Sequence, residues 1–531
     1  MGLLDEIENY NSLALEAKEK IERVYLEDNR PWVVGYSGGK DSTTTLQLII
    51  ECLMSMKEKG IQLNKTVYVI SSDTMVETPL IISSIGNNLN QIQKFVDSNK
   101  LPVETHLVRP SIDNTFWVNL IGKGYPAPNQ SFRWCTDRMK IEPTNQFIKN
   151  KVSEHGEVIV VLGVRLGESN SRDRVLKKHD IRGKDIMRHT TLANAFTFAP
   201  IKDFDIDDVW NYLLNNVSPW GASNEELFKL YADSNANECP LIIDKETKER
   251  NGSCGNSRFG CWVCTVVSED KALTGFVENG EEWLKPLLKY RNWLTKCRDD
   301  RTMRMKRRAN GSIYTIKINE KMVGSERVLI IPKKAGRDRI EIPLKNSNIL
   351  VASNGEKYNV VEVSNLKKYI LNNGIDLDKS DTPNLIVHDE YDNYNMLGLG
   401  PYTFKARAKM LQNLLEIQKS LCDDGHTVSL ITNEELREIR RQWLKRGLIE
   451  DYVPKIYYSV YKEELNCEKN DVELINNLQY EKIQSLCIEQ QVYIEPLIEM
   501  LNLENNNTGN RIKSNLSKKI NEILTKDYLH M

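Results

Sequence analysis

The sequence of 531 residues lacks both a long apolar run and an excess of either charge. No stretch approaches the ~20 consecutive apolar residues that cross a bilayer, and residues 1–6 lack the basic and apolar regions of a signal peptide. We therefore expect a cytoplasmic protein that binds no membrane. The 72 basic and 74 acidic side chains leave a formal net charge of −2, so any contact with nucleic acid requires a local basic surface.

Histidine is scarce: the chain has seven, and none has a partner at the spacing of a metal site or a catalytic triad. Cysteine is better represented, with ten residues. In a reducing compartment, cysteines that gather indicate metal, cluster or sulfur chemistry, whereas isolated ones are usually buried thiols. The length is sufficient for two or three domains, each with its own core.

A glycine-rich turn joins an apolar, β-branched run at 32–34 to a helical pattern at 43–50. Its residues are small or charged: Ser37, Gly38, Gly39, Lys40, Asp41 and Ser42. Glycines let anionic oxygens approach the main chain, and the first turn of a helix offers unpaired N–H groups and a positive dipole end. The turn is not a Walker A loop, because Val34 occupies the first glycine position and Asp41 separates Lys40 from Ser42. An ordinary turn needs only one or two glycines, so we interpret this one as a phosphate loop.

Further apolar runs at 67–70, 103–108 and 158–162 predict strands, with a helix at about 80–96 and an amphipathic helix at 3–27. This alternation predicts a parallel α/β sheet, in which ligands bind at the carboxyl ends of the strands. Four candidate nucleotide-binding residues follow strand ends: Asp73, Gly163, Arg165 and Arg172. The two arginines suit phosphates because a guanidinium is permanently charged and binds oxygens in a fork.

Cys261 and Cys264 form a Cys-x-x-Cys pair, with Cys254 ten residues before Cys264 among glycines. Such a group suits zinc or an iron–sulfur cluster, and a Cys-x-x-Cys pair alone also suits redox chemistry. No second such pair or nearby histidine pair exists, which disfavours a zinc ribbon. Cys239 and Cys135 lie upstream.

The loop at 37–42 resembles the Ser-Gly-Gly-x-Asp-Ser loop of the adenine-nucleotide α-hydrolases, the superfamily of ATP pyrophosphatases and phosphoadenylylsulfate (PAPS) reductases. Gly163, Arg165 and Arg172 resemble a second motif of the PAPS reductase group, Gly-x-Arg-x-x-Glu-Ser-x-x-Arg. The resemblance implies an α/β, Rossmann-like domain with a parallel sheet flanked by helices. It also implies ATP and Mg²⁺ as cofactors, with Lys40 and Asp41 catalytic in releasing pyrophosphate from the α-phosphorus.

The cysteines resemble those of assimilatory adenylylsulfate reductases, which hold a four-iron cluster. Cys135, Cys261 and Cys264 match three family ligands, whereas Trp134 replaces the first cysteine of the family's pair. The resemblance implies a 4Fe–4S cluster whose fourth ligand is Cys254 or Cys239. We choose Cys254, which leaves Cys239 as the catalytic thiol that carries a persulfide.

The C-terminal part contains two basic patterns. Residues 289–308 contain nine cations and Trp293, a pattern of either a phosphate-binding surface or a solvated helix face. A predicted helix at 433–445 carries the second, formed by Arg437, Arg440, Arg441, Lys445 and Arg446. We expect residues 1–282 to form the nucleotide domain, with a cluster segment at 239–264. Residues 283–531 are expected to form a mixed, largely helical region that binds DNA or a partner.

Together these features resemble the sulfurtransferases of bacterial DNA phosphorothioation. That resemblance implies three kinds of partner: DNA, a cysteine desulfurase as sulfur donor, and the other subunits of the modification system. Three alternatives remain: a PAPS or adenylylsulfate reductase, a tRNA thiolation enzyme, and a nucleotide-sensing DNA-binding subunit. The reductase fits less well because Trp134 breaks the cysteine pair and the family's reactive C-terminal tail is missing.

Overall fold

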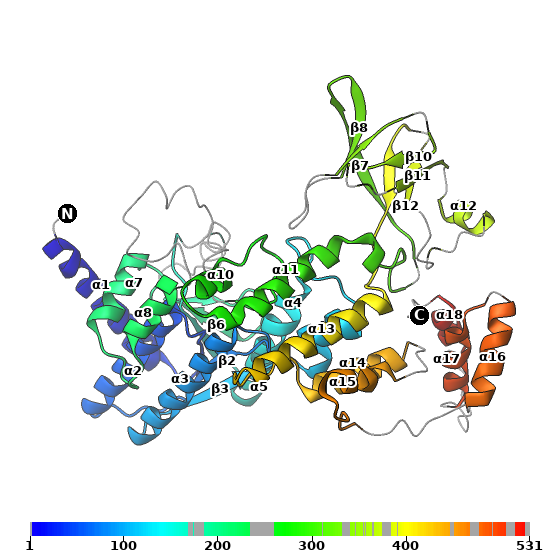
Figure 1. Cartoon of the computed structure of the whole chain (residues 1–531). Helices are drawn as coiled ribbons and strands as arrows, with labels where there is room; N and C mark the ends of the chain where they lie inside the picture. Colours follow the sequence, from blue (N-terminus) through cyan, green and yellow to red (C-terminus); the bar gives the residue numbers. More distant parts are fainter. Residues whose placement is uncertain are drawn as a thin grey trace. The chain divides into compact units, whose positions relative to one another are not determined.

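The computed structural model describes residues 3–167, 174, 185–233, 260–310, 312–331, 340–345, 347–353, 355, 357–363, 366–373, 377, 384–389, 391–446, 451–467, 477–490, 492–505 and 516–525. It divides into two compact units (Figure 1). The first contains Met1–Thr115 and Gln130–Leu288, and the second contains Phe116–Asn129 and Lys289–Met531. The boundary after Leu288 lies six residues beyond the predicted one after residue 282, and the short segment 116–129, predicted within the nucleotide domain, belongs to the second unit.

The first unit alternates strands and helices. Its strands are β1 (Trp32–Gly35), β2 (Val67–Ser72), β3 (Val103–Val108), β4 (Val158–Leu162), β5 (Ile186–Arg188) and β6 (Ala195–Phe198). Its helices are α1 (Leu3–Glu27), α2 (Lys40–Glu58), α3 (Pro79–Ser98), α4 (Trp134–Thr136), α5 (Glu142–His155), α7 (Ile206–Asn215), α8 (Asn224–Asp233) and α10 (Lys271–Glu278), with short helices η1 (Ile112–Asn114), η3 (Asp137–Ile141) and η4 (Glu282–Leu284). The predicted helix at 3–27 and the predicted strands at 103–108 and 158–162 are confirmed.

The six strands form one sheet in the order β3-β2-β1-β4-β6-β5. All neighbouring pairs are parallel except β5 with β6. Chain order reverses at β1, because β2 and β3 extend the sheet on one side and β4 on the other. Such a switch point leaves a crevice at the carboxyl ends of the two central strands. The parallel α/β prediction is therefore confirmed, and the loops after β1 and β4 lie at this crevice.

Alternate residues of β1 pack on opposite faces of the sheet, as a strand buried on both faces requires. Trp32 packs edge-on against Tyr25 of α1, with ring centroids 5.4 Å apart. Val33 belongs instead to the cluster that contains Ile148 of α5. The central strand is therefore held between helical layers, which fixes the position of the loop that follows it.

The second unit contains a seven-stranded sheet and helices. The strands are β7 (Thr315–Val323), β8 (Glu326–Ile331), β9 (Ile340–Pro343), β10 (Ile349–Val351), β11 (Lys357–Glu362), β12 (Asn384–His388) and β13 (Tyr394–Leu397), in the order β10-β11-β12-β13-β7-β8-β9. The helices are η2 (Val118–Gly122), α11 (Lys285–Asp299, which starts in the first unit), η5 (Arg301–Met303), α12 (Leu366–Asn372), α13 (Phe404–Asp423), α14 (Asn433–Leu444), α15 (Tyr452–Tyr461), α16 (Asn477–Glu489), α17 (Ile494–Asn505) and α18 (Leu516–Leu524). No helix among the described residues is long and apolar enough to span a membrane.

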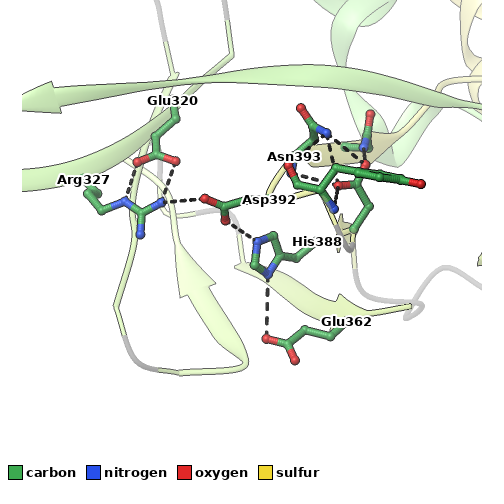
Figure 2. Close-up of polar contacts among 9 residues, drawn as sticks. Glu320, Arg327, Glu362, His388, Asp392 and Asn393 are labelled. Atoms are coloured by element: carbon green, nitrogen blue, oxygen red, sulfur yellow. Dashed lines mark hydrogen bonds and ion pairs between the residues drawn. The ribbon is translucent and has the colours of Figure 1, made fainter. Parts of the chain in front are cut away.

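An exposed chain of ion pairs crosses the surface of the second sheet (Figure 2). Arg327 of β8 pairs with Glu320 of β7 and lies 3.8 Å from Asp392, in the turn between β12 and β13. Asp392 in turn accepts from His388 at 2.7 Å, and Glu362 of β11 lies 3.7 Å from the other ring nitrogen. Exposed pairs contribute little stability individually, so we interpret this chain as a feature that orients the turn.

The segment 116–129 is enclosed by side chains of the second unit. Trp117 donates its indole N–H to the carbonyl of Leu430 at 2.6 Å, and Trp443 donates to Ile121 at 2.9 Å. Arg407, which is fully buried, donates to the carbonyl of Gly122 at 3.2 Å. Backbone carbonyls of this segment thus obtain donors from α13 and α14, and the Trp117 side chain donates to the connection between these two helices.

Candidate functional site

The loop after β1 has an internal hydrogen-bond arrangement that shapes it. Gly38 has a φ of +71°, a conformation that side chains other than glycine rarely adopt. The hydroxyls of Ser37 and Ser42 lie 3.1 Å apart, and Ser42 donates to the carbonyl of Gly39 at 2.9 Å. Gly39 is the N-cap of α2 and, because it has no side chain, makes no capping hydrogen bond to the first turn of the helix. The first turn of α2 therefore presents its N–H groups at the crevice edge, as a phosphate loop requires.

Lys40, the first residue of α2, is buried with only 3% of its surface exposed. Its ammonium lies 3.2 Å from the carboxylate of Asp41 and 5.3 Å from the ring centre of Tyr231. The Tyr231 hydroxyl also accepts the backbone N–H of Lys40 at 3.3 Å. Tyr231 belongs to α8, and no sequence motif pointed to it.

Asp41 and Arg165 join the loops after β1 and β4. Arg165, 5% exposed, donates its Nε–H to the Asp41 carboxylate. Burial opposes ionisation of Asp41, but the charges of Lys40 and Arg165 outweigh it and hold the pKa of Asp41 below its usual value. A Cβ at Gly163 would lie 2.6 Å from the Asp41 carbonyl oxygen, so only glycine permits this close approach of the two loops. The structure thus brings together Lys40, Asp41, Gly163 and Arg165.

Asp73 follows β2 and is buried, with 4% exposure. Its carboxylate accepts from the backbone N–H of Met75 at 2.8 Å and from Arg109 Nε at 2.8 Å. Arg109 follows β3, so the pair joins neighbouring strand ends on the same sheet edge as the loop. The carboxylate of Asp73 is therefore already paired within the protein, and a ligand would meet it together with Arg109.

Residues just beyond Asp73 connect this edge to the cysteine segment. Thr74 lies 3.3 Å from Cys261 through its hydroxyl and the thiol, and it donates to Glu77 at 2.9 Å. The backbone N–H of Trp262 donates to the carbonyl of Val76 at 3.0 Å, which fixes the cysteine segment along the connection between β2 and α3. Cys261 therefore lies at the carboxyl end of β2, next to the strand that carries the phosphate loop.

Cys135 and Cys261 each lie within electrostatic range of Cys264. Burial, with the charge of Glu77, raises the pKa of Cys261 well above its usual value. Burial and Cys264 likewise raise the pKa of Cys135. Lys140, 3.5 Å from Glu77, compensates these groups, and Cys261 and Glu77 raise the pKa of its ammonium.

Among the residues that the structure describes, no three His, Cys, Asp or Glu side chains are arranged as a metal-binding group. The predicted ligands Cys135, Cys261 and Cys264 are neighbours without such an arrangement. Cys239, Cys254 and Arg172 lie outside the described residues. The iron–sulfur ligand set therefore stays a prediction.

The basic run at 289–308 is largely internal. Five of its nine cations are buried: Arg291, Arg298, Arg301, Arg304 and Lys306. Arg304 donates to the carbonyls of Gly400 at 2.7 Å and Arg298 at 2.6 Å, and Arg298 donates to Pro128 at 3.0 Å. This run is therefore neither a continuous phosphate-binding surface nor a uniformly solvated helix face. The buried guanidiniums of Arg298, Arg301 and Arg304 hydrogen-bond backbone carbonyls. Lys289, Lys296 and Arg308 are exposed.

The second basic pattern, on α14, is nearer the surface. Arg437, Arg441 and Lys445 are exposed, although Arg441 pairs with Glu438 and Arg437 donates to the carbonyl of Asn466 at 2.9 Å. Arg440 is half-buried and pairs with Asp451. The helix retains a cationic surface, reduced by these internal pairs.

Comparison with known proteins gives one family match. Residues 31–267 match the family model described as the phosphoadenosine phosphosulfate reductase domain. An uncharacterised protein of Methanocaldococcus jannaschii is 25% identical over 287 residues, which are 54% of this chain and 46% of that protein. The chain thus spans about half the length of the curated relative that it matches.

Two solved structures resemble the chain at 15% identity. One is PAPS reductase from Candida auris in a phosphate complex, with 43% of this chain and 91% of that chain covered and a TM-score of 0.27. The other is the U34-tRNA thiolase NcsA from Methanococcus maripaludis with its 4Fe–4S cluster, with 54% and 80% covered and a TM-score of 0.25. Similarities of this size carry no argument about substrate or cofactor.

Proposed function

We propose that this chain, whose residues 31–267 form a PAPS reductase-like domain of the nucleotide-using, sulfur-related enzyme fold, is a DNA phosphorothioation sulfurtransferase of the DndC type. It would use ATP to activate a backbone phosphate of DNA, and would then replace a non-bridging oxygen with sulfur. The proposal places the enzyme in the cytoplasm, where its DNA substrate and a cysteine desulfurase would be available.

The observation that supports the proposal is the shared sheet edge of the phosphate loop and the cysteine segment. The loop follows β1, and Cys261 contacts Thr74 at the end of the adjacent strand β2, with hydroxyl and thiol 3.3 Å apart. An enzyme that cleaves ATP and transfers sulfur needs both groups at one site. A protein that only sensed nucleotide would have no need for thiols there.

In the first step, a non-bridging oxygen of a DNA phosphodiester attacks the α-phosphorus of ATP. The bond from that phosphorus to the oxygen shared with the β-phosphate breaks, and pyrophosphate leaves with this oxygen. The N–H groups at the start of α2 and the Lys40 ammonium stabilise the leaving charge. Asp41 holds Lys40 and Arg165 in place, and Mg²⁺ bound with ATP would shield the phosphates.

In the second step, a sulfur nucleophile attacks the activated DNA phosphorus, and AMP leaves with the oxygen that DNA contributed. We assign Cys239 to carry this sulfur as a persulfide received from the desulfurase, and its outer sulfur forms the bond to phosphorus. A second thiol then attacks Cys239 Sγ, which breaks the S–S bond, releases the phosphorothioate and leaves a disulfide that an external dithiol reductant returns to two thiols. Cys135, Cys261 and Cys264, with Cys254, would hold a 4Fe–4S cluster, which would cross-link the segments that carry these thiols. Because the three described thiols form no metal-binding group, no step of this mechanism passes through the cluster.

DNA and the other phosphorothioation subunits are proposed as partners of the second unit. The exposed cations of this unit include Lys289 and Lys296 of α11, Arg308, Arg437 of α14 and Lys445 at its C-terminal end. Phosphate contacts by such residues would make affinity fall steeply with salt.

The experiment that tests the proposal measures pyrophosphate release from ATP in the presence of DNA. Lys40→Ala should reduce the rate by at least about 100-fold, since it removes the main cation for the leaving group. Lys59→Ala, at the opposite end of α2, is the matched control and should retain the rate. Normal release from Lys40→Ala would show that the loop assignment is wrong. Replacing DNA with tRNA tests the thiolation alternative by the same readout, whereas a PAPS or adenylylsulfate reductase would release sulfite from its nucleotide and no pyrophosphate from ATP. Neither pyrophosphate nor sulfite with any of these substrates would favour a nucleotide-sensing subunit.

The cofactor assignment is tested by iron content and visible absorbance of anaerobically purified protein. Cysteine-to-serine variants at 135, 254, 261 and 264 should lose iron, whereas Cys239→Ser and the exposed Cys422→Ser should retain it. Loss of iron in Cys239→Ser but not in Cys254→Ser would exchange the two roles. Bound zinc in an iron-free wild type would contradict the cluster.

A further inference from the structure

We propose that Tyr231 is a positioning residue of the phosphate loop, and this inference rests on the proposed function of that loop. Tyr231 is contributed by α8, far along the chain from the loop, and is 6% exposed. It restricts Lys40 through a hydrogen bond to the backbone and a cation–π contact with the side chain, and it lies close to Gly39. Its role would be to hold Lys40 where the leaving pyrophosphate needs a cation.

The first contact involves the backbone. The Tyr231 hydroxyl accepts the N–H of Lys40 at 3.3 Å, and this amide is the first of α2. The amides of a helix's first turn are donors for a bound phosphate. A hydroxyl bonded to one of them lies where it can also contact a phosphate oxygen, because a tyrosine hydroxyl both accepts and donates.

The second contact involves the side chain. The Lys40 ammonium lies 5.3 Å from the Tyr231 ring centre on one side and 3.2 Å from Asp41 on another. Cation–π attraction is strongest when the cation is desolvated, and Lys40 is 3% exposed. The ring and the carboxylate together restrict an otherwise mobile side chain. A cation fixed before the reaction stabilises a leaving anion without reorganisation.

The third contact explains a sequence requirement. A Cβ at Gly39 would lie 3.0 Å from the Tyr231 hydroxyl, so the loop is glycine here partly to accommodate the tyrosine. Tyr231 is itself held by Trp210 of α7, with ring centroids 5.2 Å apart and planes at 83°. The carbonyl of Asp233, at the end of α8, accepts from Asn279 at 2.6 Å. Tyr231 is therefore held by its packing against Trp210 of α7 as well as by its contact with the loop.

Tyr68 provides a matched control in the same unit. It is buried on β2, its hydroxyl lies 3.2 Å from His155 Nε2, and the Lys151 ammonium lies 4.3 Å from its ring centre. Tyr68 thus makes the same kinds of contact as Tyr231 but away from the phosphate loop. Tyr231→Phe and Tyr68→Phe should lower the melting temperature similarly if hydroxyl loss matters only for folding.

The test titrates inorganic pyrophosphate into the full-length protein by calorimetry. Wild type and Tyr68→Phe should bind equally, whereas Tyr231→Phe should bind about tenfold more weakly and Tyr231→Leu more weakly still, because the leucine also removes the ring. Equal binding by wild type and Tyr231→Phe would overturn the positioning role while leaving the proposed function intact. Absence of pyrophosphate binding in the wild type would instead overturn the proposed function.

A second measurement uses a fluorine label in place of a substitution that removes the hydroxyl or the ring. 3-Fluorotyrosine placed at position 231 retains the ring and the hydroxyl, and its ¹⁹F resonance should shift on addition of pyrophosphate. The same label at position 68 should not respond. An unmoved resonance at position 231, in protein that binds pyrophosphate, would overturn the inference.

Discussion

At the scale of single residues, the carboxylate of Asp41 has two buried cations as neighbours. Lys40 lies 3.2 Å away and Arg165 donates to the other carboxylate oxygen. The two cations would repel each other without this carboxylate, and the loops after β1 and β4 would lose their link. Asp41 therefore serves the fold as well as the proposed chemistry.

Asp41→Asn should lower the free energy of unfolding by about 2 kcal/mol at neutral pH, since it removes charged hydrogen bonds from a largely buried site. The folded-state pKa of Asp41 lies below its unfolded value near 4. Its contribution is therefore complete above about pH 4 and is lost as the pH falls through the folded pKa. Urea unfolding at a series of pH values should show the wild type and the variant converging on acidification.

Glu154→Gln is the control for this measurement. Glu154 is an exposed carboxylate of α5 paired with Lys151 at 2.8 Å, and its replacement should leave the urea midpoint nearly unchanged at every pH. A constant difference between wild type and Asp41→Asn from neutral to acid pH would contradict the assignment of the charge to Asp41.

The motif residues of the site could be predicted from the sequence, whereas the residues that hold them in place could not. The glycines, Lys40 and Asp41 are adjacent in the chain, so one short stretch reveals the loop. Arg165 could be found because it follows a strand end in a parallel sheet, where distant loops meet. Tyr231 lies in an amphipathic helix with no motif, and only the tertiary packing of α8 brings its hydroxyl to Lys40.

At the scale of secondary-structure elements, local sequence patterns were sufficient to locate an element where interactions between residues near in sequence determine it. Thr432 and Glu435 form a capping box at the start of α14, and Asp205 caps α7, both in residue patterns that can be read from the sequence. Apolar runs located β2 and β4 because both strands are buried between neighbouring strands. The basic run at 289–308 could not be interpreted from local patterns, because its arginines donate to carbonyls about a hundred residues away, such as that of Gly400.

Burial divides the cations of this run into two groups, and only the exposed group is expected to contribute to the proposed DNA binding. Arg304→Met should lower the free energy of unfolding by about 3 kcal/mol, because it leaves the carbonyls of Gly400 and Arg298 without their donor. Lys296→Ala, on the exposed side of α11, should leave stability unchanged. Chemical denaturation of both variants measures this difference.

The salt dependence of DNA affinity completes the comparison. If DNA contacts α11, Lys296→Ala should reduce the slope of log affinity against log salt by about one phosphate contact. A folded, fully stable Arg304→Met protein with a reduced slope would show that the guanidinium faces DNA, contrary to its buried position.

At the scale of the whole molecule, the chain enters the second unit twice. It does so first for residues 116–129 and again from residue 289 onward. The first segment includes Phe116, Trp117 and Leu120, each at most 2% exposed, and its carbonyls accept bonds from Arg407 and Trp443. Nothing in its sequence distinguishes it from a loop of the nucleotide domain. The second unit therefore has a core that the C-terminal half cannot complete alone.

A chain that ends at residue 288 should consequently aggregate, because residues 116–129 would expose apolar side chains normally enclosed by α13 and α14. Replacing this segment with a flexible Gly/Ser linker of equal length should restore a soluble monomer, measured by size-exclusion chromatography and circular dichroism.

Conversely, residues 289–531 should gain thermal stability when a synthetic peptide of residues 116–129 is added, since a ligand that binds only the folded state stabilises it. A monomeric, fully folded 1–288 chain with its natural segment, together with no response of 289–531 to the peptide, would show that the two parts fold independently.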